Sequence, residues 1–150
     1  MKLQPRYLIS IDEFQRRLKN SKLILPVHSN CVGTAFFLCG LIKEDTYIEP
    51  RLEEVHNCFV DVKPEYATFM VAEYKKLDKS KKKEKTIIQH VLIFHPFDPS
   101  VVYHRIGKNG PFMESNSHYA HHALIHYNKR KNLYVRYCGL NYSVIDMLLN

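Results

Sequence analysis

The sequence contains no long hydrophobic run. No apolar segment approaches the roughly 18 residues that a membrane-spanning helix requires, so we expect no membrane span. The opening residues, MKLQPRYLISIDEFQRRLKN, carry charges throughout and lack the continuous apolar core of a signal peptide. We therefore expect a cytoplasmic protein, or one that is exported by a route without a classical signal peptide.

Cysteine is sparse and shows no close pairing. The four cysteines form no CxxC pair and no dense framework, which is typical of reduced thiols in a cytosolic protein. A disulfide stays an alternative if the protein is exported.

Internal repeats and Gly/Ser-rich linkers are also absent. A chain of 150 residues is long enough to bury a core without disulfides or a structural metal, so residues 1–150 are expected to form one domain. The 45% hydrophobic content argues against a disordered chain.

Positive charge is in excess, and much of it lies in one segment. The formal net charge is +7, and residues 75–85, KKLDKSKKKEK, hold seven lysines against Asp78 and Glu84. Such a run predicts a solvated loop between strands, and the alternative is a contact surface for an acidic partner. The run has no interleaved aromatic residues and no known nucleic-acid motif, which argues against nucleic acid as the partner.

Hydrophobic periodicity and turn residues predict helices followed by a mostly antiparallel sheet, which is an α+β domain. Ser10 and Glu13 form a capping-box pattern at the start of the first helix. The expected helices cover residues 11–20, 31–43 and 115–128, the last with Ser115 or Asn116 near its cap; the expected extended segments cover 22–27, 65–76, 86–95, 101–106 and 132–140.

Cys31 stands at the start of the apolar helix, in HSNCVGTAFFLCGLI. A helix N-terminus favours a thiolate and lowers the pKa of the thiol, and its backbone N–H groups can stabilise an oxyanion. Cys31 is therefore the candidate nucleophile, whereas Cys39, Cys58 and Cys138 are interpreted as packing residues. His28 and Asn30 flank the nucleophile as candidate oxyanion or substrate-binding residues, although Asn30 could also simply cap the helix.

His90 precedes the apolar run VLIF in the strongest strand signal of the chain. If the hairpin turn centres near Phe97, residue 90 lies opposite His104, within reach of a ring-to-ring hydrogen bond. Asp98 is the acidic competitor, but it lies in the turn and too far along the strand. His90 is thus the candidate base and His104 the candidate residue that orients it.

The segments NCVGTAFFLCGL and HVLIFHPFDPSVVYHRIGKNGPF together resemble the NlpC-like family of papain-fold cysteine peptidases and amidases. In that family a cysteine begins the central helix, a strand of the type HVxIY carries the histidine, and the next strand supplies a polar residue, often a second histidine. The resemblance covers residues from Asn30 to about Phe112.

The resemblance implies a papain-like fold in which N-terminal helices, including the nucleophile helix, pack on the sheet. It implies a cysteine hydrolase with a Cys31–His90–His104 triad, no cofactor, and a peptide or protein substrate. The bond cleaved would be an amide, an isopeptide or a thioester bond.

Two other functions fit parts of the sequence. The first is a non-catalytic binding module on the same scaffold, which contacts an acidic partner through the lysine-rich residues 75–85. The second is a metal site on the C-terminal helix, where His118, His122 and His126 share one face beside His121. No carboxylate lies in that segment to complete a metal shell, so no metal is expected.

Overall fold

The computed structural model describes residues 7–23, 28–127 and 132–149, but not the side chains of Tyr127 and residues 146–149. Its helices are α1 (Ile11–Leu23), α2 (Cys31–Cys39), α3 (Glu53–His56), the 3-10 helix η1 (Pro64–Tyr66), α4 (Ser117–Tyr127) and α5 (Tyr142–Leu149). Its strands are β1 (Phe59–Asp61), β2 (Phe69–Asp78), β3 (Lys83–Phe94), β4 (Val101–Arg105), β5 (Phe112–Asn116) and β6 (Tyr134–Leu140). None of these helices is long and apolar enough to cross a membrane.

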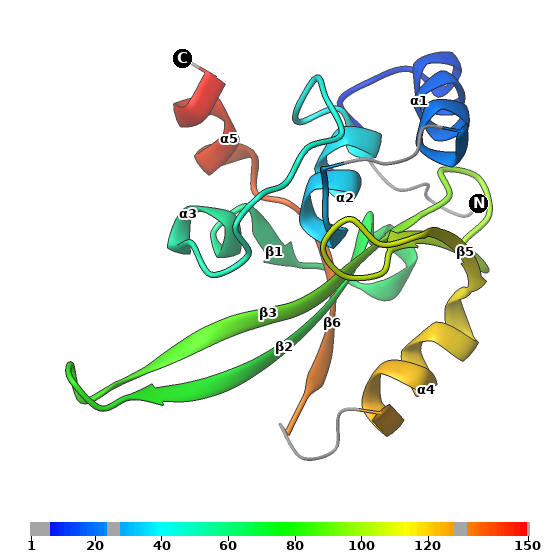
Figure 1. Ribbon diagram of the computed structural model, residues 1–150. Helices are drawn as coiled ribbons and strands as arrows, with labels where there is room; N and C mark the ends of the chain where they lie inside the picture. Colours follow the sequence, from blue (N-terminus) through cyan, green and yellow to red (C-terminus); the bar gives the residue numbers. More distant parts are fainter. Residues whose placement is uncertain (1–6, 24–27, 128–131, 150) are drawn as a thin grey trace.

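The six strands form one sheet in the order β1-β6-β2-β3-β4-β5, and every neighbouring pair is antiparallel. Because strand side chains alternate between the two faces, each face carries its own core. The α2 side holds Val91 and Ile93, whereas Leu92 and Phe94 face Ala120 of α4. Figure 1 shows α1 and α2 above the sheet and α4 below it. The expected α+β class with an antiparallel sheet is confirmed.

Helix α1 begins at the predicted cap. The Ser10 Oγ accepts a hydrogen bond from the Glu13 N–H at 3.1 Å. Phe14 is fully buried against the α2 side of the sheet. The helix runs to Leu23, beyond the expected end at residue 20, so it takes in the first part of the expected extended segment 22–27. Residues 24–27 of that segment lie outside the described residues.

Helix α2 is the buried helix that the apolar run predicts, but it is shorter. All nine of its residues are buried, and the Asn30 Oδ1 caps it by accepting from the Gly33 N–H at 2.9 Å. The expected end at residue 43 is wrong, because Gly40 adopts a left-handed conformation with φ of 95°. Its N–H turns back to the carbonyls of Phe36 and Phe37, which closes the helix.

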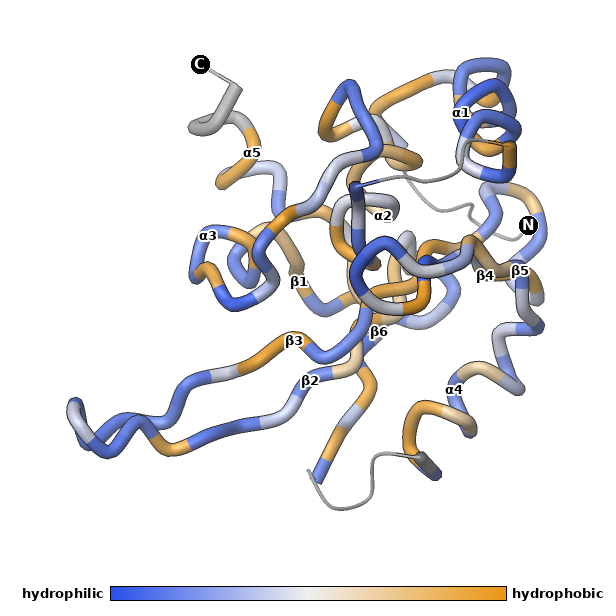
Figure 2. The backbone as a smooth tube through the Cα atoms, in the orientation of Figure 1, coloured by the Kyte–Doolittle hydropathy of each residue, from blue (hydrophilic) through white to orange (hydrophobic). Residues whose placement is uncertain are grey.

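The lysine-rich residues 75–85 do not form a loop between strands. They belong to β2 and β3, which pair with each other as far as Asp78 and Lys83, so only residues 79–82 turn. Strand β6 pairs with β2 only as far as Glu73. Residues 74–87 therefore form a two-stranded projection, the β2–β3 arm, which extends away from the body in Figure 1 and is largely hydrophilic in Figure 2.

The hairpin of β3 and β4 is shifted from the expected register: each β3 residue lies opposite a β4 residue two positions further along the chain than expected. Ile93 pairs with Tyr103 and Phe94 with Val102, so the turn centres on Asp98 and not on Phe97. His90 is therefore not directly opposite His104. The two lie diagonally on one face of the sheet, a separation that long side chains can bridge.

Several elements differ from the sequence-based expectation. The expected strand 65–76 begins only at Phe69, because Pro64–Tyr66 form a 3-10 turn. Residues 115 and 116 of the expected helix 115–128 complete β5, and Asn116 caps α4 by accepting from the Tyr119 N–H at 3.1 Å. Residue 128 lies outside the described residues. Strands β1 and β5 and helices α3 and α5 were not predicted, because they are short or lack clear periodicity.

Gly33 is required by a close backbone approach to α2. A Cβ at this position would lie 1.7 Å from the carbonyl oxygen of Thr46. We expect Gly33→Ala to lower the free energy of unfolding by about 3 kcal/mol, measured by urea denaturation. Gly139→Ala is the control, because its Cβ would meet Val62 at an ordinary 3.4 Å. Equal stability of the two variants would contradict the close approach.

Candidate active site

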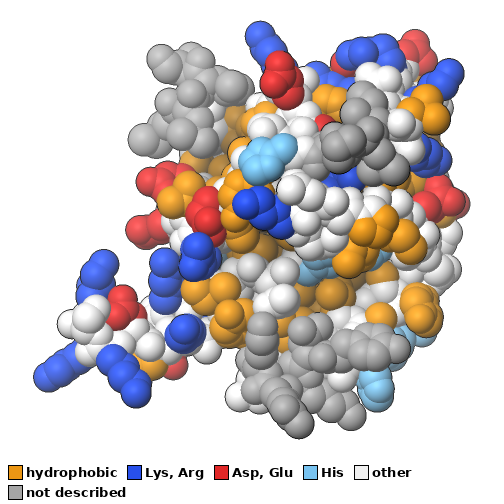
Figure 3. Space-filling view, in the orientation of Figure 1, with side chains coloured by type: hydrophobic (Ala, Val, Ile, Leu, Met, Phe, Trp, Pro, Cys, Tyr) orange, Lys and Arg blue, Asp and Glu red, His pale blue; other side chains and the backbone are white. Residues whose placement is uncertain are grey.

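A cavity of about 550 Å³ opens at the N-terminus of α2. Cys31 lines it from α2, His90 and Leu92 from β3, and His104 from β4. Tyr119, Ala120, Ala123 and Leu124 of α4 form an apolar wall. Figure 3 shows hydrophobic side chains gathered beside histidine on this face of the molecule. The fold therefore brings the three predicted catalytic residues to one cavity.

The two histidines form a hydrogen-bonded chain that continues to a serine. The His90 Nε2 lies 2.7 Å from the His104 Nδ1, and the His104 Nε2 lies 3.2 Å from the Ser115 Oγ. If each Nε2 carries its proton, His90 donates to His104 and His104 donates to Ser115. That tautomer leaves the Nδ1 of His90 as a free base. Ser115 was considered only as a helix cap from the sequence, and its place on β5 beside β4 supplies this contact.

Both histidines are neutral at physiological pH. Burial, together with a smaller effect of the neighbouring His104, lowers the pKa of His90 to about 3. Burial also lowers the pKa of His104 to about 4. A neutral imidazole has a nitrogen free to accept a proton, but a pKa this far below neutral makes His90 a weak base in the resting site.

Cys31 is 7% exposed, and burial raises the pKa of its thiol. The backbone N–H groups of Val91, Val32 and Cys31 itself lower the pKa, but burial outweighs them. Burial therefore favours the neutral thiol of Cys31 and not the activated thiolate that the sequence predicts. The resting cavity thus holds a neutral thiol and a neutral imidazole, so in a hydrolase the proton would have to leave the sulfur during attack.

Asn30 and His28 have different surroundings. Besides capping α2, the Asn30 side chain accepts from the Ile48 N–H at 3.2 Å and donates to the Ile48 carbonyl at 2.7 Å. Asn30 thus anchors the segment after α2 to the cavity rim, and the expected capping role is confirmed. His28 is exposed, and its ring lies against that of Tyr47 at 5.8 Å between centroids.

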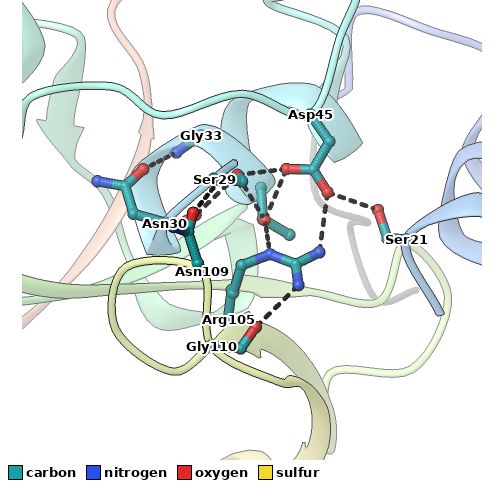
Figure 4. A network of polar contacts seen from close by, with 9 residues as sticks. Ser21, Ser29, Asn30, Gly33, Asp45, Arg105, Asn109 and Gly110 are labelled. Carbon is teal, nitrogen blue, oxygen red and sulfur yellow. Dashed lines mark hydrogen bonds and ion pairs between the residues drawn. The ribbon is translucent and has the colours of Figure 1, made fainter. Parts of the chain in front are cut away.

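A buried ion pair supports the loop that precedes Cys31. The Asp45 carboxylate lies 3.0 Å from the Arg105 guanidinium, whose side chain is fully buried. The same carboxylate accepts hydrogen bonds from the hydroxyls of Ser21, Ser29 and Thr34 at 3.0, 2.5 and 2.8 Å. Figure 4 shows these side chains converging on Asp45 from separate elements.

Arg105 completes this network with two further bonds. Its Nε donates to the Thr34 hydroxyl at 2.8 Å and its Nη1 to the Gly110 carbonyl at 3.0 Å. The network was missed from the sequence. The available signal was the alternation in VVYHR, which places Arg105 on the same inward face as Tyr103.

Other cysteines and histidines have partners outside the cavity residues Cys31, His90 and His104. Cys39, Cys58 and Cys138 are buried in the core, and burial raises the pKa of each thiol. On α4 the His118 and His122 rings are 4.5 Å apart, and the His121 Nδ1 lies 2.8 Å from the Tyr137 hydroxyl. Within the described ranges, no three His, Cys, Asp or Glu side chains gather closely enough to hold a metal ion.

Comparison with known proteins gives no match, whether to protein-family models, to curated proteins or to solved structures. The site must therefore be interpreted from its own geometry.

The Asp45–Arg105 pair leads to a stability prediction. Removing the carboxylate leaves a buried, unpaired guanidinium, so Asp45→Ala is expected to cost about 3 kcal/mol or more in the free energy of unfolding. Glu44→Ala, at the exposed neighbouring residue, is the control and is expected to cost little. An Asp45→Ala variant as stable as Glu44→Ala in urea would show that the pair contributes nothing.

The histidine pair leads to a pH prediction. Unfolded histidines have a pKa near 6.5, whereas the folded values are about 3 and about 4. The unfolded state therefore binds more protons below pH 6.5, and stability falls as the pH falls through this window. We expect the two histidines together to lose about 3 kcal/mol of stability between pH 6.5 and 5.

The measurement is urea denaturation at several pH values in that window. His90→Gln/His104→Gln is expected to flatten the pH dependence, and His118→Gln/His126→Gln, at exposed positions of α4, is the matched control. The same slope in the first variant and in the unmodified protein would contradict the assignment.

Proposed function

We propose that this protein is a cysteine hydrolase, a peptidase or amidase, that cleaves an amide, isopeptide or thioester bond. The observation that carries the proposal is that the Cys31 thiol and the His90 ring line one cavity. The His90 Nε2 lies 2.7 Å from the His104 Nδ1, so His104 can orient that ring. A cysteine at the N-terminus of a buried helix, with histidines on two strands of the adjoining sheet, also agrees with a papain-like fold of the NlpC type.

In the first half of the proposed reaction, His90 Nδ1 takes the proton from the Cys31 thiol as the sulfur attacks the substrate carbonyl carbon. The carbonyl π-bond electrons move to oxygen, and the backbone N–H of Cys31 stabilises the oxyanion. The oxyanion collapses, the bond to the leaving group breaks, and the His90 imidazolium gives its proton to that group. The product is a thioester between Cys31 and the acyl group.

In the second half, His90 takes a proton from water, and the resulting hydroxide attacks the thioester carbonyl. Collapse of the second oxyanion breaks the carbon–sulfur bond, and the imidazolium returns its proton to the sulfur. His104 stabilises the transient charge on His90 through the Nε2–Nδ1 hydrogen bond and keeps the ring in orientation. No cofactor takes part.

A second candidate function is a non-catalytic binding module that uses the β2–β3 arm. The observation that favours it is the raised pKa of the Cys31 thiol, because a buried neutral thiol is typical of a packing residue. This candidate predicts that Cys31→Ala changes no measurable activity.

The two candidates are separated by hydrolysis of a panel of acyl thioesters, glutamine amides and peptides. We expect Cys31→Ala to lower kcat by about 10³-fold or more, and His104→Ala by about 10²-fold. Mass spectrometry should find the acyl adduct on Cys31. Cys39→Ala, in the same helix, is the matched control and should retain activity. Turnover of any of these substrates that is equal in Cys31→Ala and in the unmodified protein would refute the mechanism.

A further inference from the structure

The β2–β3 arm carries a concentration of lysines that is locally unfavourable. Lys76 lies directly opposite Lys85 in the strand register, and like charges at opposed positions destabilise a sheet. Lys82 occupies a left-handed turn position with φ of 50°, where glycine or asparagine has a lower conformational energy. Residues that weaken local structure in this way are expected at binding surfaces, where selection for binding outweighs local stability.

The lysines lie on an exposed surface. Lys76, Lys83 and Lys85 share one face of the arm, and the turn adds Lys79, Lys81 and Lys82. Figure 3 shows several lysine side chains projecting from the arm among uncharged and acidic side chains. At the root of the arm, Glu73 is fully buried and forms an ion pair with Arg136 of β6, which fixes the arm to the sheet.

The outer edge of β3 has no neighbouring strand along the arm. Strand β4 pairs with β3 only at Ile93 and Phe94, so within the described chain the edge from Lys83 to Ile88 meets no other strand. An open edge presents backbone N–H and C=O groups to which an extended peptide can pair. Lysines at a strand edge also discourage aggregation. That role explains neither the pairing of Lys76 opposite Lys85 nor a lysine at the left-handed position 82.

The same strand leads from the arm to the candidate nucleophile. The backbone N–H of Val91 lies against the Cys31 sulfur. Lys85 lies about 20 Å from Val91 along β3, at 3.3 Å per residue. A peptide paired to this edge would therefore run from the lysines towards the cavity of Cys31 and His90.

We propose that the β2–β3 arm docks an acidic, extended polypeptide segment, which pairs with the edge of β3 and places acidic side chains at alternate positions against Lys83 and Lys85. An extended peptide is favoured over nucleic acid because only a polypeptide can form the strand hydrogen bonds that this edge offers. The idea that the segment is delivered to Cys31 rests on the proposed hydrolase function. The idea that the arm binds the segment does not.

Docking is tested on the full-length Cys31→Ala variant, which cannot turn over the peptide. The probe is a short fluorescein-labelled peptide of alternating glutamate and threonine, and binding is read by fluorescence anisotropy. We expect the glutamine version to bind about tenfold more weakly or worse, because it lacks the charges. A version with proline in place of alternate threonines keeps the charges but cannot form the strand pairing, so it should also bind more weakly.

Matched lysine variants locate the site. Lys83→Gln/Lys85→Gln in the Cys31→Ala background is expected to weaken binding of the glutamate peptide about fivefold or more, and added salt should weaken it further. Lys19→Gln/Lys43→Gln removes two exposed lysines elsewhere and should leave the affinity unchanged. Equal binding of the glutamate and proline peptides, or displacement by duplex DNA at a lower concentration than by unlabelled peptide, would overturn the proposal.

Two assays keep this inference separate from the proposed function. If Cys31→Ala binds the peptide as expected but the unmodified protein hydrolyses no member of the substrate panel, docking stands and the hydrolase proposal fails. If the unmodified protein hydrolyses a thioester through Cys31 but Lys83→Gln/Lys85→Gln does not weaken peptide binding, the hydrolase proposal stands and docking fails.

Discussion

The buried ion pair between Arg105 and Asp45 is the constraint on which the candidate site depends. One carboxylate receives the guanidinium and three hydroxyls, so the loop before α2, the helix itself and β4 are tied to a single point. Burying two charges is unfavourable unless each is paired and hydrogen-bonded, and here both are. The arrangement fixes the N-terminus of α2 against the end of β4, and with it Cys31 in the lining of the cavity that also contains His90 and His104.

The electrostatics of the cavity follow from burial. Desolvation raises the pKa of the Cys31 thiol and lowers that of both imidazoles, because burial disfavours the charged form of each group. A thiolate–imidazolium pair at rest is thereby replaced by two neutral partners. In the proposed mechanism, proton transfer from sulfur to nitrogen is coupled to attack on a bound carbonyl, where the oxyanion and the imidazolium stabilise each other. The same burial that makes Cys31 a poor free nucleophile protects it from unrelated electrophiles.

The arm and the cavity are linked through one strand. Strand β3 carries lysines at its start and His90 and Val91 at the cavity, and its outer edge is open along the arm. If the two proposals hold, the lysine-rich arm and the candidate catalytic site lie on one strand, and the strand itself fixes the distance between them. The lysines that dominate the net charge of the chain thus have a defined position relative to the site.

The sequence by itself determined the α+β class, the capped helix α1, the buried helix beginning at Cys31 and the strands around His90 and His104. Each of these follows from local periodicity, capping residues or turn residues. Only the tertiary structure decided the register of β3 with β4, the end of α2 at Gly40, the lysine arm, and the ion pair of Arg105 with Asp45. The reason is physical: register and strand extension depend on which segments pair. A buried ion pair joins residues whose separation in sequence gives no periodic signal, and the pKa directions at Cys31 and His90 come from burial, which exists only once the chain has folded.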